Sequence, residues 1–527
     1  MQNLSEIVTI NGRPFNSLLD SGFKKLISNE MVALYDAGFG ITLDKDLREL
    51  KEYIAHVAHE IKNKIADQIS ERFLALILDI ASKNNRSVVG ISAQYNENGQ
   101  IKIHTLGMIV LEEAHAANYI TKTVIECLKP YNVLITHVVS MTTDNASAML
   151  AMIKRFDDAV NDLSVPEDVD TDAIDLEIPS FENDGPLTEH QMQSIMHAVI
   201  DSAELNEVLD DQNDYENLFE EIIARDNGIE YSNPHLSTEP RWDSDYLMLC
   251  DLRKCENAIT FFATKESTFK TVSQKMPIIK EAVKILQIPY EVTKSLKKPE
   301  CTLSDFYGMC IMMREKLKFQ TSQHNKTNLA NKLLDEFEDR RLQFIRNQAM
   351  LAAVCLDRRF TADMAECEVE LGKLMLCKIW EKLKNSRNVT GEVHEEPVQE
   401  TNDDDKFDFA LQSLQNIFAQ KPNEERSQAT PNYEKSKSEF LISLNEFERK
   451  FPLLHHETPI LKFWEGQKNN YPELYEVALI IFSIPPSQAT VERSFSQFSF
   501  VFDCRRSRIS SKLLEEILLS KLNKSSA

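Results

Sequence analysis

The chain has 527 residues, with 83 acidic and 59 basic side chains and a formal net charge of −24. This length is too great for one simple core and predicts about two or three domains, and 42% hydrophobic with 27% charged residues is typical of a folded, soluble protein. No apolar run is long enough to cross a bilayer, and the N-terminus lacks the basic start and apolar core of a secretion signal. We therefore expect neither a membrane protein nor a secreted one.

The acidic residues are concentrated in one block. Residues 156–224 contain 21 Asp and Glu and no Lys or Arg, so the rest of the chain is close to neutral. A strongly acidic protein looks unsuited to nucleic acid, because phosphates are neutralised by Lys and Arg. The uneven distribution leaves room for a basic groove elsewhere. The block itself reads as a solvated linker, with an interaction tail as the alternative.

Nine cysteines are scattered along the chain without a Cys-x-x-Cys pair. Cys250 and Cys255 are the closest two, and no second pair or His-x-x-x-His accompanies them, so no zinc site is evident. Scattered free thiols are typical of a reducing compartment, the cytosol or the nucleus.

The first part of the chain reads as a helical region, residues 1–70, followed by an α/β segment, residues 71–155. In that segment the apolar patterns predict, in order, three strands, a helix and a fourth strand at 73–80, 87–95, 101–110, 114–129 and 133–142. A glycine turn joins the second and third strands as a hairpin. This order is typical of the opening of a ribonuclease-H-like fold of the α/β (α+β) class, a topology that does not by itself establish function.

The rest of the chain alternates between linkers and helical regions. We expect an acidic linker at 156–190, broken by prolines, and an all-α insertion domain at 191–384, where apolar residues recur at helical spacing. A second acidic and polar linker at 385–435 precedes a C-terminal helical region, 436–527.

Three acids stand where a metal site could form. Asp79 ends the first predicted strand, Asp144 follows the fourth, and Glu492 lies on a helix near the C-terminus. Phosphodiester cleavage with two Mg²⁺ or Mn²⁺ ions about 4 Å apart requires carboxylate ligands, which adjacent strand ends and one helix can present together. Each acid also has a structural explanation. An Asp at a strand end is commonly a turn or cap residue, and Glu492 can pair with a helical neighbour.

The C-terminal region carries an ordered series of motifs. An apolar helix, a proline stop, a Glu-Arg-x-Phe-Ser helix, a basic group and a final Leu-rich helix follow one another, with the first four at 471–478, 485–486, 492–496 and 505–508. This series resembles the C-terminal signature of the hAT superfamily of cut-and-paste DNA transposases. The resemblance implies a ribonuclease-H-like core interrupted by a large helical insertion. It also implies that Asp79, Asp144 and Glu492 form a DDE triad that binds Mg²⁺ or Mn²⁺.

Further residues match the family in the helical insertion. Pro240–Leu249 resembles a family motif whose tryptophan, here Trp242 after Arg241, stacks near a flipped base. His197 resembles the histidine of a Cys-x-x-His motif, with Ser194 in place of the cysteine. A core tryptophan and a buried histidine are the alternative readings.

Basic residues near the C-terminus are candidates for DNA contact. Arg493 belongs to the Glu-Arg motif, and Arg505, Arg506 and Arg508 form a dense basic group. They predict phosphate contacts, with solvated charge at a helix start as the alternative.

Two functions follow from the resemblance. The first is a nuclear transposase that binds DNA, cleaves transposon ends and forms a homodimer or higher oligomer through its C-terminal region. The second is a domesticated, non-catalytic nuclear protein that acts as a dimerising DNA- or protein-binding scaffold. The three acids favour the first. The acidic charge and the lack of Cys and His ligands for a BED-type zinc finger favour the second.

Overall fold

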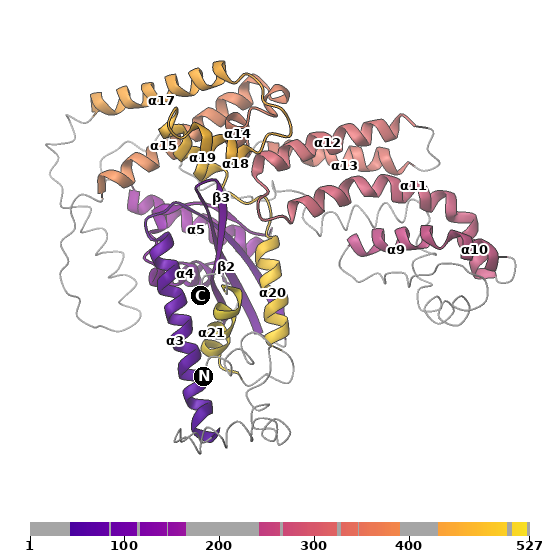
Figure 1. The fold of residues 1–527 in the computed structure, drawn as a ribbon, viewed down its shortest axis with the longest axis horizontal. Helices are drawn as coiled ribbons and strands as arrows, with labels where there is room; N and C mark the ends of the chain where they lie inside the picture. Colours follow the sequence, from indigo (N-terminus) through magenta and orange to yellow (C-terminus); the bar gives the residue numbers. More distant parts are fainter. Residues whose placement is uncertain are drawn as a thin grey trace. The chain divides into compact units, whose positions relative to one another are not determined.

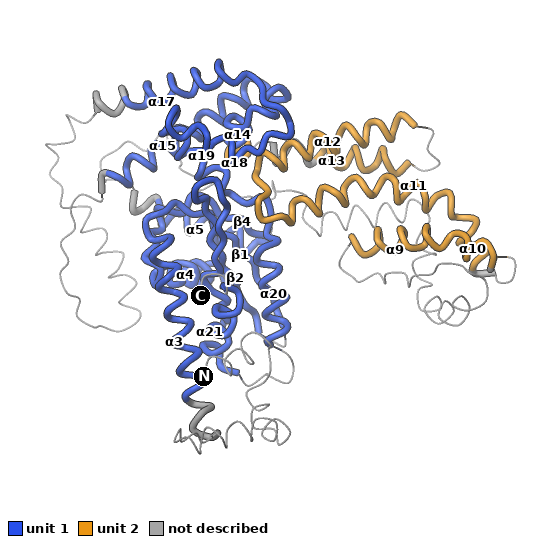
Figure 2. Tube along the Cα trace, viewed as in Figure 1, with its two compact units in different colours: residues 1–182, 351–527 blue, residues 183–350 orange. Residues whose placement is uncertain are grey.

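The structure is a computed structural model that describes residues 43–83, 86–112, 116–144, 146–164, 242–263, 267–323, 328–345, 347–389, 430–502 and 509–523. The chain divides into two compact units (Figure 2). The first comprises residues 1–182 and 351–527, and the second comprises residues 183–350. The first unit is therefore assembled from two distant parts of the sequence.

A four-stranded mixed sheet lies within the first unit, in the order β3–β2–β1–β4 (Figure 1). β1 (Leu74–Lys83), β2 (Arg86–Glu97) and β3 (Gln100–Leu111) are antiparallel neighbours, and β4 (Val138–Thr142) is parallel to β1. These elements confirm the four predicted strands and the mixed α/β class.

Two details of the sheet follow from local sequence. Asn98 and Gly99 turn the β2–β3 hairpin with positive φ angles of 50° and 74°, the backbone conformation that an Asn-Gly pair adopts most readily. The prediction of a fourth strand from residue 133 was too long, because a 3-10 turn, η3 (Ile135–His137), precedes β4.

One face of the sheet is covered by helices that are close to it in sequence. α3 (Leu43–Ile69), α4 (Ala117–Leu128) and α5 (Ser147–Ser164) contribute to one apolar cluster with the β-strands, and the 3-10 turn η2 (Lys129–Tyr131) follows α4. Because α5 buries Phe156 and Val160 in that cluster, it continues beyond the predicted linker boundary at residue 156.

The opposite face is covered by helices from the far end of the chain. α20 (Ala489–Val501) and α21 (Ser511–Leu522) form a second apolar cluster with Ile77, Val88 and Met108 of the strands. The leucines and isoleucine of the last helix and the phenylalanines of α20 pack in the core, except that Phe500 is 55% exposed. The C-terminal region thus completes the core of the first unit.

Six further elements lie wholly or mostly in the first unit. They are α14 (Gln348–Leu356), η4 (Thr361–Asp363), α15 (Glu366–Val389), α17 (Thr430–Lys450), α18 (Ile460–Gln467) and α19 (Pro472–Ile481). Buried Trp464 donates its Nε1–H to Leu356 O at 3.2 Å, which ties α18 to α14. Because α14 and α15 pack with the C-terminal helices, the first unit resumes at residue 351, well before the predicted end of the insertion at 384.

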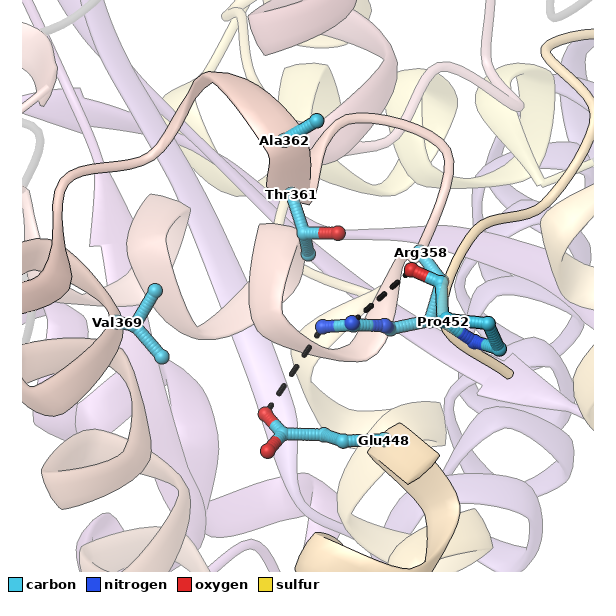
Figure 3. Close-up of a pocket in the computed structure, with 6 residues that line it drawn as sticks. All are labelled: Arg358, Thr361, Ala362, Val369, Glu448 and Pro452. Carbon is cyan, nitrogen blue, oxygen red and sulfur yellow. Dashed lines mark hydrogen bonds and ion pairs between the residues drawn. The ribbon is translucent and has the colours of Figure 1, made fainter. Parts of the chain in front are cut away.

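An arginine clamp holds the loop between α17 and α18. Arg358 donates to the carbonyl oxygens of Phe451 and Pro452 at 2.9 and 3.1 Å, and its guanidinium lies 3.9 Å from Glu448. Figure 3 shows these side chains around a small cavity that is also lined by η4 residues and Val369. Since Arg358 is occupied by these partners, the cavity reads as part of the packing of this loop.

The second unit is helical throughout its described part. It contains α9 (Trp242–Lys254), α10 (Glu256–Phe262), α11 (Ser267–Leu296), α12 (Leu303–Thr321) and α13 (Leu329–Ile345). A capping box between Thr302 and Asp305 starts α12. No helix in the described ranges is both long and apolar enough to cross a membrane.

Candidate active site

Asp79 lies on the sheet face that α20 covers. Side chains alternate along a strand, and Ile77 and Ala81, two residues away on either side, both pack in the cluster with α20 and α21. Asp79 is half-buried, and the Ile80 N–H donates to its Oδ1 at 2.8 Å. The strand thus places a carboxyl group beside the C-terminal helices.

Asp144 approaches the same edge of the sheet from β4. β4 runs parallel to β1 with Thr142 opposite Ile77, so two further residues along each chain bring Asp144 level with Asp79. The Asp144 Oδ1 accepts a 3.3 Å hydrogen bond from the Ala146 N–H in the turn before α5. The turn role considered for Asp144 is therefore present. It uses one of about four acceptor positions of the carboxylate and leaves the others available.

Glu492 is brought to this edge by α20. It lies in the first turn of the helix and is exposed, while its neighbour Val491 is fully buried against the sheet. The side chain therefore stands at the rim of the helix–sheet contact. More than 340 residues separate Glu492 from Asp144 in the sequence, so only the fold of the first unit brings them near each other.

Electrostatics link the three acids. The pKa of Asp79 is raised from 3.8 to about 7: burial is the largest cause, the hydrogen bond from Ile80 acts against it, and the negative charges of Asp144 and Glu492 add to the rise. Both partners are therefore close enough to act on Asp79. Carboxylates that disfavour one another's charge provide the field that a hard divalent cation neutralises.

The three carboxylates do not form a compact single-ion cage. Among the described residues, the one group of at least three His, Cys, Asp or Glu whose ligand atoms all lie within 4.8 Å of one another is His455, His456 and Glu457. At least one pair of ligand atoms of Asp79, Asp144 and Glu492 therefore lies more than 4.8 Å apart.

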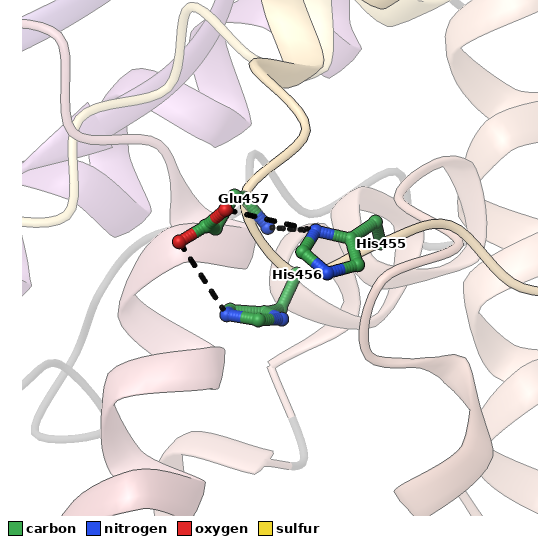
Figure 4. Close-up of side chains that lie close together, drawn as sticks. All are labelled: His455, His456 and Glu457. Atoms are coloured by element: carbon green, nitrogen blue, oxygen red, sulfur yellow. Dashed lines mark hydrogen bonds and ion pairs between the residues drawn. The ribbon is translucent and has the colours of Figure 1, made fainter.

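His455, His456 and Glu457 were not predicted as a site from the sequence, although their adjacency in the chain is a signal that could have indicated one. Figure 4 shows the two imidazoles and the carboxylate close together. The Glu457 N–H donates to His455 Nδ1 at 3.4 Å, and the three side chains are 68–78% exposed. Imidazole suits zinc or copper better than magnesium, so this group differs in chemistry from the three acids.

The remaining predicted site residues are placed as follows. Arg493 is exposed on α20 and donates to Thr490 Oγ1 at 3.2 Å, and Trp242 is the first residue of α9 in the second unit. The others lie outside the described residues: His197, Arg241, Arg505, Arg506 and Arg508. The predicted DNA contacts of all these side chains stay predictions.

The C-terminal region matches a known protein family. Residues 433–523 match the family model described as the hAT family C-terminal dimerisation region. The matched range includes α20 with Glu492 and α21. In this region the chain is therefore similar to hAT-family transposases, as its motifs predict, and the match supports dimer formation.

A curated relative extends the comparison upstream. The Zea mays protein named "Putative AC transposase" is 23% identical to this chain over 329 residues. The match covers 57% of this chain and 37% of the maize protein, so this chain spans well under half of that relative's length.

Proposed function

We propose that this protein cleaves and transfers DNA strands in a metal-dependent reaction, with Asp79, Asp144 and Glu492 as its DDE triad. The observation that carries the proposal is the convergence of three acids from distant parts of the chain at one sheet edge, where two of them raise the pKa of the third. A structural core has no need of such a cluster, since it costs stability when no cation is bound.

The proposal includes a ribonuclease-H-like core interrupted by a helical insertion. Its support is the sheet order β3–β2–β1–β4 with β4 parallel to β1, together with a first unit that resumes after residues 183–350. In this reading the N-terminal half provides two acids on strands, and the C-terminal half returns with the third on α20.

The donor set fits Mg²⁺ or Mn²⁺. All three side chains offer hard carboxylate oxygens, and the pKa of Asp79 is raised mainly by burial and in smaller part by the charges of Asp144 and Glu492. When bound, such ions stabilise the charge on the attacking and leaving oxygens of a phosphodiester. Asp79 and Asp144 would hold the ions from the rigid sheet, and Glu492 would close the set from α20. In the same proposal Trp242, His197, Arg241 and the C-terminal arginines contact DNA in the nucleus.

The test is nicking of supercoiled plasmid by the purified full chain in Mn²⁺ or Mg²⁺. We expect metal-dependent nicking that falls at least about 100-fold in Asp144→Asn, because a neutral amide cannot hold a divalent ion as a carboxylate does. Asp158→Asn is the matched control, since it removes one exposed negative charge from the neighbouring helix α5. Equal nicking by Asp144→Asn and the control would overturn the triad.

A domesticated scaffold is the second candidate function, and the net charge of −24 favours it. Metal binding separates the two candidates even if cleavage requires specific DNA ends. The transposase reading predicts that Mn²⁺ raises the melting temperature of the wild type and of Asp158→Asn but not of Asp144→Asn. A melting temperature that does not respond to Mn²⁺ in any of the three proteins would favour the scaffold.

A further inference from the structure

We infer that Gly90 and Val491 are positioning residues that set the height of α20 above the sheet, and so place Glu492 beside Asp79 and Asp144. The inference rests on the proposed function, because it concerns the geometry of the same three acids. Its basis is a steric contact at the point where the helix meets the strand that pairs with β1.

Gly90 lies directly across from Asp79. The two residues are register partners in the antiparallel β1–β2 pair, so their side-chain positions are neighbours on the same face of the sheet. That face is the one covered by α20, because Val88, two residues from Gly90, packs in the cluster with Val491. The absent side chain of Gly90 therefore leaves a notch next to the carboxylate of Asp79.

Val491 fills that notch. A Cβ built on Gly90 would lie 2.6 Å from Val491 Cγ1 and 3.3 Å from Phe495 Cζ, where ordinary contacts begin near 3.4 Å. Gly90 does not have a positive φ, so the fold requires glycine here for space and not for backbone conformation. A glycine inside a strand commonly marks such a close approach.

The contact acts directly on Glu492, the next residue after Val491. A methyl group at position 90 would push α20 outward by about 1 Å, because its Cβ would lie 2.6 Å from Val491 Cγ1, where ordinary contacts begin near 3.4 Å. Displacements of about 1 Å in a catalytic set can cost about 100-fold in rate. Because Asp79 stays on β1 and Asp144 stays just beyond the end of β4, this shift would separate the third acid from the other two.

Polar contacts hold the segments on either side of α20 but do not set the distance between α20 and the sheet. Gln94 donates to Ser483 O at 2.9 Å and Thr142 donates to Pro485 O at 3.2 Å, both ahead of the helix. Lys83 donates to Ser499 O at 2.8 Å near its end. These single bonds to backbone oxygens tolerate small changes of angle and distance, whereas the closely packed notch does not. The contact between Gly90 and Val491 is therefore the one that fixes the distance between α20 and the sheet.

The experiment compares Gly90→Ala, Val491→Ala and the double variant by Mn²⁺ titration, plasmid nicking and melting temperature. We expect Gly90→Ala to weaken Mn²⁺ binding at least about tenfold and to reduce nicking about 100-fold. The double variant should recover both to within about threefold of Val491→Ala alone, because removing the two valine methyl groups makes room for the new one. The double variant also keeps the test valid if Gly90→Ala alone fails to fold.

Gly107→Ala is the matched control. Its Cβ would lie 2.9 Å from Cys127 Sγ, away from α20, so it crowds the same sheet elsewhere. We expect it to lower the melting temperature without changing Mn²⁺ affinity.

The outcomes distinguish this inference from the proposed function. If the wild type binds Mn²⁺ through Asp144 and Gly90→Ala binds it equally well, the positioning role alone is overturned. The same conclusion follows if the double variant shows no recovery. If the wild type shows no Asp144-dependent Mn²⁺ binding, the proposed function and this inference both fail.

Discussion

The two faces of the sheet differ in what covers them and in what they carry. One face is packed by α3, α4 and α5, which are close to the strands in sequence, and it is apolar. The other is packed mainly by α20 and α21, which follow the strands by more than 340 residues, with Leu50 and Ile54 of α3 in the same cluster. It carries Asp79, Gly90 and buried polar side chains such as Ser92 and Gln94. The first face contributes only to the core, whereas the second contributes to the core and also carries residues of the candidate active site.

The difference shows how an acidic cluster can be tolerated in a folded unit. The face covered by α3, α4 and α5 buries a large cluster of apolar side chains, and burial of apolar surface contributes about 25 cal/mol per Å². The α20 face loses part of that gain to Asp79 and to side chains without an internal hydrogen-bond partner, namely Ser92 Oγ, Ser140 Oγ and both Asn96 side-chain atoms. We expect substitutions on the local face, which α3, α4 and α5 cover, to have little effect on function. Substitutions on the distant face, which α20 and α21 cover, should impair it.

The largest loss of stability should come from a cavity in the apolar cluster between the sheet and α20. Phe498 is 1% exposed on α20 and stacks on Phe502, whereas Phe500 on the same helix is 55% exposed. Phe498→Ala should lower the free energy of unfolding by about 3–5 kcal/mol because it opens a cavity, and Phe500→Ala by less than about 1 kcal/mol. The urea midpoint of the two variants checks this. Equal midpoints would mean that α20 is not an integral part of the core.

The next effect concerns the end of α21 and the free edge of β3. Asn523 accepts from the Thr105 N–H at 3.0 Å and donates to Thr105 O at 2.9 Å, and all four atoms are buried. Asn523→Ala leaves two buried backbone groups without partners and should cost about 2–4 kcal/mol. Asn470→Ala, which removes an exposed bond to Gln467, is the control and should change stability by less than about 0.5 kcal/mol. A result in which both variants melt with the wild type would show that α21 does not seal this edge.

Much of the face covered by α3, α4 and α5 could be predicted from the sequence, because its strands and turn are specified by patterns of neighbouring residues. Apolar runs gave three strands nearly in full, and an Asn-Gly turn identified the hairpin. The boundary of α5 was missed, since its acids suggested a linker while Phe156 and Val160 pack inward. One of those acids, Asp157, is buried and raises the pKa of Lys382 on α15 against the larger lowering by burial, a long-range pairing that composition does not reveal.

The distant face could be predicted only in part. The three acids were found through the ordered motifs, but their spacing depends on how closely α20 approaches β2. That distance is set by Gly90 and Val491, which are far apart in the chain. A glycine in a strand pattern is a signal for close approach of another segment, but the sequence around Gly90 does not show which residue fills the space. Likewise, His455, His456 and Glu457 are adjacent in the sequence, but adjacency alone does not show that their ligand atoms lie within 4.8 Å of one another.

The prediction that tests the site most directly concerns its pH dependence. The Asp79 carboxyl has a pKa of about 7 in the metal-free folded protein and about 3.8 when unfolded. The folded state therefore holds a proton that the unfolded state releases between these values, so stability falls as pH rises from about 4 to 7 and stays lower above 7. Asp79→Asn should remove this decline in the presence of EDTA.

A divalent cation must displace that proton, which links the pH dependence to the proposed reaction. Mn²⁺ should therefore raise the melting temperature by several degrees at pH 8 and by much less at pH 5.5, where Asp79 is largely protonated. The measurement is a pair of melting curves, with Mn²⁺ and with EDTA, at each pH. An equal Mn²⁺ increment at both pH values, or an undiminished increment in Asp79→Asn at pH 8, would place the bound ion away from Asp79. The exposed His455–His456–Glu457 group would then be the next site to substitute, because Asp79→Asn leaves its ligand atoms unchanged.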